Sequence, residues 1–251
     1  MKKWLTLTNI MALLMIVLYI MDRWIIPIPE NYNGFKWEDA LYEAIEEDSL
    51  NEILENQADE FNSYKISSGY CGGVITNALG IIRQDINPNG HDIYRYVTCV
   101  FTHGFHLHLI TNVIAFIIIG NFIEKRLGVI QMLGLFFLTN IIGILLTNFV
   151  LSNIASNVMA TAGASAGIFG LFGIGFAMCL QNKENFKDFS ILKKIYLIIY
   201  GVVPTYIISF GWTTAAHDFS FVIGIILGYI LFFTIPKYKE LVNSDKSTEN
   251  N

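Results

Sequence analysis

The stretch Ala160-Thr-Ala-Gly-Ala-Ser-Ala-Gly-Ile-Phe-Gly-Leu-Phe-Gly173 places the Ser165 hydroxyl among small residues at the start of a long apolar run. Gly163, Gly167 and Gly170 fall at i, i+4 and i+7, which lie on one face of a helix. Small residues at this spacing let membrane helices approach closely, so the stretch predicts a tightly packed membrane helix. On this evidence Ser165 is either a packing residue or a nucleophile, and a nucleophile would need a base within reach.

Long uncharged segments indicate a polytopic membrane protein. Of the 251 residues, 53% are hydrophobic, and the net charge of −5 comes mostly from one external segment, so it does not indicate nucleic-acid binding. The predicted fold class is all-α, with six transmembrane helices and a long external loop between the first two. Apolar stretches long enough to cross a bilayer lie near 5–26, 107–123, 128–150, 163–180, 195–211 and 214–235.

The distribution of lysine and arginine predicts the orientation. Basic residues gather on one side of the six-helix arrangement, whereas the connections 151–162 and 212–213 carry no charge. Because cytoplasmic loops are rich in basic residues, we expect a cell-membrane protein with both termini in the cytoplasm. The predicted segments are a first membrane helix (1–26), an external loop (27–106), membrane helices two to six (107–235) and a cytoplasmic tail (236–251).

The external loop contains an acidic insert at 36–65, with ten acidic residues and apolar residues near helical spacing. We interpret it as a solvated helical insert, and a docking surface for a partner is the alternative. Cys71 and Cys99 both lie in this loop, and their spacing alone does not establish a disulfide.

Three of the five histidines lie at 103, 106 and 108. On a helix, His106 and His108 point about 200° apart and cannot face one ion, whereas a zinc site needs several ligands that do. We therefore expect no metal and no cofactor. His108 and Asn112 share one helix face at the outer start of the second span, where they serve either a helix–helix hydrogen bond or a functional site.

The sixth span begins with the histidine that could serve Ser165. His217 shares a helix face with Ser220, Gly224 and Gly228, which together form a smooth strip. Packing of this strip on the glycines of the fourth span would bring His217 to Ser165.

A serine with a neutral histidine is the minimum for nucleophilic acyl transfer. Asp218 points about 100° away from His217 on a helix, so the sequence predicts a dyad rather than a triad. The oxyanion would meet the Ser165 backbone N–H, the His108 imidazole and the Asn112 amide.

At these residues the chain resembles the rhomboid family of intramembrane serine proteases. The resemblance implies a six-helix bundle around a water-filled cavity, a Ser165 nucleophile, a His217 general base, and His108 and Asn112 in the oxyanion hole. It implies cleavage of membrane-protein substrates in or near their transmembrane segments. Structural support is implied for the remaining matches: Arg95 after Tyr94, His103, Gly120, Glu124, Gly163, Gly167, Gly224 and Gly228.

Two positions depart from the family pattern, because Ala166 and Ser220 stand where glycine is usual. The alternative function is a catalytically silent rhomboid-like protein that binds client membrane proteins, but such a protein would not need both Ser165 and His217. A transporter is a more distant alternative, because no span carries a deeply placed acidic residue.

Overall fold

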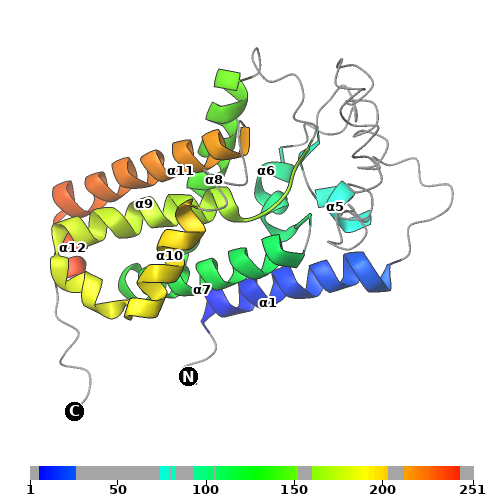
Figure 1. Ribbon diagram of the computed structural model, residues 1–251. Helices are drawn as coiled ribbons and strands as arrows, with labels where there is room; N and C mark the ends of the chain where they lie inside the picture. Colours follow the sequence, from blue (N-terminus) through cyan, green and yellow to red (C-terminus); the bar gives the residue numbers. More distant parts are fainter. Residues whose placement is uncertain are drawn as a thin grey trace. The chain divides into compact units, whose positions relative to one another are not determined.

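The computed structural model describes residues 6–26, 74–79, 81–82, 93–104, 106–151, 160–202 and 212–243 (Figure 1). The predicted acidic insert at 36–65 and Cys71 lie outside these ranges. The helical nature of the insert therefore stays a prediction.

The described part of the chain is helical apart from one short β pair. Helices α7 (His106–Leu127), α8 (Val129–Leu151) and α9 (Ser165–Gln181) follow one another, and α11 (Trp212–Tyr229) continues as a π-helical turn (Ile230–Thr234). The remaining elements are α1 (Leu7–Ile20), a π-helical turn (Met21–Ile25), α5 (Val74–Leu79), β1 (Ile81–Ile82), α6 (Arg95–Thr98), a 3-10 turn (Cys99–Phe101), β2 (Ala160–Thr161), η3 (Lys183–Asp188), α10 (Ile191–Val202) and α12 (Pro236–Asn243).

Among the described residues, three helical segments are long and apolar enough to cross a membrane: His106–Leu127, Val129–Val150 and Thr214–Thr234. They match the predicted second, third and sixth spans, and membrane embedding follows from them. Leu7–Ile20 and Ser165–Gln181 are apolar but shorter, and they overlap the predicted first and fourth spans. The count of six membrane helices stays a prediction.

The chain forms two compact units. The first comprises Met1–Ala12, Ile114–Ile154 and Ser165–Asn251, and the second comprises Leu13–Val113 and Ala155–Ala164.

The first unit is built around α8, α9 and α11, and α9 and α11 lie side by side (Figure 1). Glycine allows their backbones to touch, because a Cβ atom on Gly224 would lie 2.1 Å from the Gly170 carbonyl oxygen. Likewise, a Cβ atom on Gly173 would lie 2.2 Å from the Phe221 carbonyl oxygen. The predicted approach of the fourth and sixth spans is therefore present at Gly170 and Gly224.

Two details of the predicted glycine strips are wrong. Gly163 does not lie on the face of α9, because it precedes the helix and has a φ of 120°, a value that favours glycine. Gly167 faces α8 rather than α11, since a Cβ atom there would lie 2.6 Å from the Phe136 ring.

A residue near the C-terminal end of α7 fixes the start of α1. The Glu124 carboxylate accepts hydrogen bonds from the Leu7 N–H at 3.2 Å, the Thr8 N–H at 3.0 Å and the Thr8 hydroxyl. The two N–H groups are ones that a helix N-terminus leaves without intrahelical partners, and a negative charge there is also favourable to the helix dipole. Gly120 lies one turn earlier, where a Cβ atom would lie 2.8 Å from Thr8 Cγ2.

In the second unit, β1 pairs with β2 antiparallel, with Ile81 opposite Thr161 and Ile82 opposite Ala160. Asp22 caps the short helix α5 by accepting from the Ile75 N–H at 2.6 Å and the Thr76 hydroxyl at 2.6 Å.

Candidate functional site

Ser165 and His217 form a hydrogen-bonded pair in the first unit. Ser165 is the first residue of α9, and His217 lies in the second turn of α11. The close approach of these helices brings Ser165 Oγ to 2.8 Å from His217 Nε2. The His217 side chain is buried and Ser165 is half-buried. This is the arrangement that a hydroxyl nucleophile and an imidazole base require.

Phe169 holds one face of the His217 ring. The two rings stack with their centroids 4.3 Å apart and their planes at 2°. Tyr200 of α10 packs against the same phenylalanine, with ring centroids 5.6 Å apart. Phe169 was not among the residues predicted from the sequence, although an aromatic residue four positions after Ser165 lies on the same helix face and was a usable signal.

His108 and Asn112 converge on Gly163 in the second unit. A Cβ atom on Gly163 would lie 2.7 Å from His108 Nε2 and 3.4 Å from Asn112 Nδ2. The Gly163 N–H donates to the Cys99 carbonyl oxygen at 2.9 Å, which fixes the backbone at this point. Both side chains therefore face the segment that leads into Ser165.

His106 faces elsewhere, as its helical position predicts. Its Nδ1 atom is 2.7 Å from the Tyr19 hydroxyl, and its ring stacks on Trp24 with centroids 5.7 Å apart and planes at 14°. His106 and His108 thus contact different neighbours.

His103 supports the His108 ring from outside the helix. It is fully buried, and its ring meets that of His108 edge-to-face with centroids 5.1 Å apart. Burial, together with the nearby His108, lowers the pKa of His103 well below its usual value, so the ring is neutral at pH 7. Arg95 is also buried in this unit and lies 5.4 Å from the centre of the Tyr94 ring.

Ser220 is accommodated by glycine on a neighbouring helix. Its hydroxyl donates to the Thr139 carbonyl oxygen at 3.3 Å. A Cβ atom on Gly143 would lie 1.9 Å from Ser220 Oγ, so Gly143 leaves the space that the serine occupies. Ser220 therefore packs against α8. Ala166 is buried in the first turn of α9, and Gly228 faces Ala177.

Within the described ranges, no three histidine, cysteine, aspartate or glutamate side chains gather closely enough to hold a metal ion.

The Rhomboid domain model matches residues 90–234, which is more than half of the chain. The chain belongs to the rhomboid family. It is 27% identical over 166 residues to RHOMBOID-like protein 1 of Arabidopsis thaliana, covering 64% of this chain and 40% of that protein. It is 31% identical over 144 residues to Rhomboid-like protease 3 of Toxoplasma gondii, covering 54% of this chain and 50% of that protein.

A third relative is Rhomboid protease GlpG of Haemophilus influenzae, which is 24% identical over 149 residues, covering 55% of this chain and 70% of that protein. This rhomboid chain spans half or less of the length of the Arabidopsis and Toxoplasma relatives.

Proposed function

We propose that this rhomboid chain is an intramembrane serine endopeptidase that cleaves peptide bonds in or near the transmembrane segments of membrane proteins. The observation that carries the proposal is the 2.8 Å contact between Ser165 Oγ and His217 Nε2. Membership of the rhomboid family and the two relatives named as proteases support it.

In the proposed reaction, Ser165 Oγ attacks the carbonyl carbon of the scissile peptide bond while His217 Nε2 takes the hydroxyl proton. The tetrahedral intermediate collapses when the imidazolium returns this proton to the leaving amine, which leaves an acyl group on Ser165. Water, deprotonated by His217, then attacks the acyl carbon and frees Ser165. Phe169 stacks on the imidazole and opposes its rotation away from Ser165.

The proposed oxyanion hole combines the Ser165 backbone N–H with the His108 imidazole and the Asn112 amide. The first N–H groups of a helix have no intrahelical acceptor, and they favour a negative charge. Gly163 lies two residues before Ser165 in the chain, so the covalent backbone keeps the two within about 7 Å. His108 and Asn112 both face Gly163, two residues before the proposed nucleophile in the chain, and this supports their part in the proposal.

The wider architecture belongs to the same proposal. It comprises six membrane helices, cytoplasmic termini in the cell membrane, an external loop at 27–106 and a catalytic region at 107–235. The lysine asymmetry and the three membrane-spanning candidates support it.

The proposal is tested by incubating the purified chain in liposomes with a generic single-span substrate. We expect the parent to cleave the substrate and Ser165→Ala to be inactive. We expect His217→Ala to be inactive too, and the double variant to be no worse than either single variant, because the two residues act as one unit. Substrate binding without cleavage by the parent in several lipids would instead favour a silent client-binding protein.

A further inference from the structure

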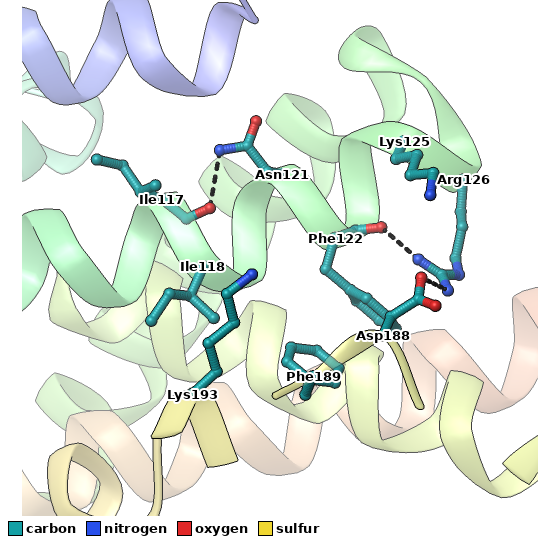
Figure 2. Close-up of a pocket in the computed structure, with 9 residues that line it drawn as sticks. All are labelled: Ile117, Ile118, Asn121, Phe122, Lys125, Arg126, Asp188, Phe189 and Lys193. Carbon is teal, nitrogen blue, oxygen red and sulfur yellow. Dashed lines mark hydrogen bonds and ion pairs between the residues drawn. The ribbon is translucent and has the colours of Figure 1, made fainter. Parts of the chain in front are cut away.

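A pocket of about 430 Å³ lies in the first unit, between α7 and the segment that contains η3 and the start of α10 (Figure 2). None of its lining residues belongs to the Ser165–His217 pair. The pocket is lined by Ile117, Ile118, Asn121, Phe122, Lys125, Arg126, Asp188, Phe189 and Lys193.

The polar part of the pocket is positively charged. Three of its lining residues are basic and one is acidic, so its formal net charge is +2. Arg126 forms an ion pair with Asp188, and its side chain is only 9% exposed. The other two basic residues of the lining are Lys125 and Lys193, and both are exposed.

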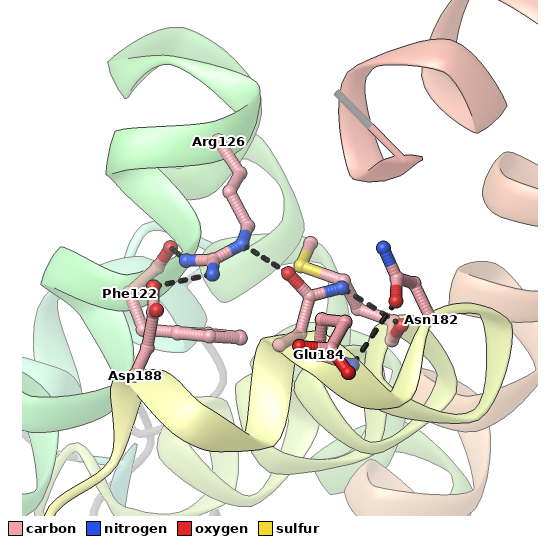
Figure 3. Close-up of polar contacts among 7 residues, drawn as sticks. Phe122, Arg126, Asn182, Glu184 and Asp188 are labelled. Atoms are coloured by element: carbon pink, nitrogen blue, oxygen red, sulfur yellow. Dashed lines mark hydrogen bonds and ion pairs between the residues drawn. The ribbon is translucent and has the colours of Figure 1, made fainter. Parts of the chain in front are cut away.

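Hydrogen bonds fix the Arg126 side chain in the polar wall of the pocket (Figure 3). Its Nε donates to Asn185 Oδ1 at 2.9 Å, its Nη1 donates to the Phe122 carbonyl oxygen at 3.1 Å, and its guanidinium lies 3.9 Å from the centre of the Phe122 ring. Asn185 is buried and donates in turn to the Met178 carbonyl oxygen at 3.3 Å. The wall is thus a preformed part of the fold.

The other part of the pocket is apolar. Ile117 and Ile118 precede Lys125 and Arg126 by eight residues, so they lie about 12 Å away along the α7 axis. Ile117 is 37% exposed on a helix that is apolar enough to cross a membrane, so its side chain is available to lipid. Figure 2 shows Lys193 extending from α10 toward Ile118.

We propose that this pocket binds an anionic phospholipid. The phosphate lies between Lys125 and Lys193, and an acyl chain follows Ile117 and Ile118. Basic pockets between membrane helices on the cytoplasmic side suit anionic lipid head groups. A soluble phosphate would use the lysines but leave the isoleucines uncovered, so the apolar wall favours a lipid. The inference does not depend on peptide-bond cleavage.

The test measures lipid retention by native mass spectrometry on the full chain in detergent, with phosphatidylglycerol, phosphatidylcholine or inorganic phosphate added. We expect the parent to retain phosphatidylglycerol over phosphatidylcholine. Lys125→Gln/Lys193→Gln should weaken phosphatidylglycerol binding by about tenfold or more. The matched control is Lys183→Gln/Lys194→Gln, which removes the same charge from the same end of the molecule and should retain the parent preference.

Equal weakening by the two double variants would contradict the proposal, because net charge rather than the pocket would then set the affinity. Inorganic phosphate that displaces phosphatidylglycerol at equimolar concentration would contradict a lipid-specific site. Ile117→Ala provides a second test without a charge change. It should weaken phosphatidylglycerol retention, whereas Ile114→Ala, one turn earlier and outside the pocket, should not.

Discussion

At the scale of single residues, an imidazole base must keep Nε2 directed at the hydroxyl that it deprotonates. A hydrogen bond fixes one atom of the ring but still permits the ring to rock around that contact. The parallel stack with Phe169 restricts this motion from one face, and Tyr200 supports Phe169 from α10. In the proposed reaction, Phe169 is therefore a positioning residue that acts through His217.

We predict that Phe169→Leu lowers kcat by about tenfold while leaving KM nearly unchanged, because an aromatic stack contributes about 0.5 to 1.5 kcal/mol beyond its buried area. Phe169→Tyr, which keeps the ring, should retain most of the activity. Phe176→Leu is the matched control on the same helix, since the Phe176 ring contacts the Phe221 ring. Steady-state cleavage in liposomes measures these values, and equal losses in Phe169→Leu and Phe176→Leu would argue against a role through His217.

The residues that face Gly163 give a different expectation. His108→Ala and Asn112→Ala should each lower turnover by about 10² to 10³, because each removes one oxyanion donor and leaves the nucleophile in place. His106→Ala should stay near the parent rate, since His106 contacts Tyr19 and Trp24. Turnover by His108→Ala that equals turnover by His106→Ala would remove His108 from the proposed oxyanion hole.

At the scale of elements, the contact between α9 and α11 sets the position of both members of the pair. We predict that Gly224→Ala lowers the melting temperature, since its new methyl group would lie 2.1 Å from the Gly170 carbonyl oxygen. Overpacking of this kind costs about 1 to 3 kcal/mol. Gly134→Ala is the matched control in α8, because nothing lies within 4 Å of the added atom. Thermal unfolding in detergent should separate the two variants, and equal melting temperatures would contradict this packing.

Helical spacing was sufficient to predict that the fourth and sixth spans would meet and bring Ser165 to His217. It could not say which neighbour each small residue would face. A third helix, α8, lies against both α9 and α11. For this reason Gly167 packs against Phe136, and Ser220 fits beside Gly143. Local sequence patterns also could not predict the partners of Glu124 and Arg126, because Thr8 and Asp188 lie 116 and 62 residues away in the chain.

At the scale of the whole molecule, the lysine asymmetry predicts the topology. A single cysteine introduced into an otherwise cysteine-free chain should react with an impermeant reagent from outside the cell when it is placed at residue 60. A cysteine placed in 181–194 or after Pro236 should react only after the membrane has been permeabilised, which gives the reagent access to the cytoplasmic side. Labelling of residue 60 from the cytoplasmic side alone would overturn the proposed orientation.

The most direct test of the central claim is labelling by a fluorophosphonate, which reacts with a serine only when its hydroxyl is activated. The purified chain in lipid is treated with the probe, and the modified residue is identified by peptide mass spectrometry. We predict labelling of Ser165 in the parent, none in Ser165→Ala and much less in His217→Ala. Undiminished labelling of Ser165 in His217→Ala would remove the histidine from the mechanism, and an unlabelled parent would contradict the proposal that Ser165 is a nucleophile.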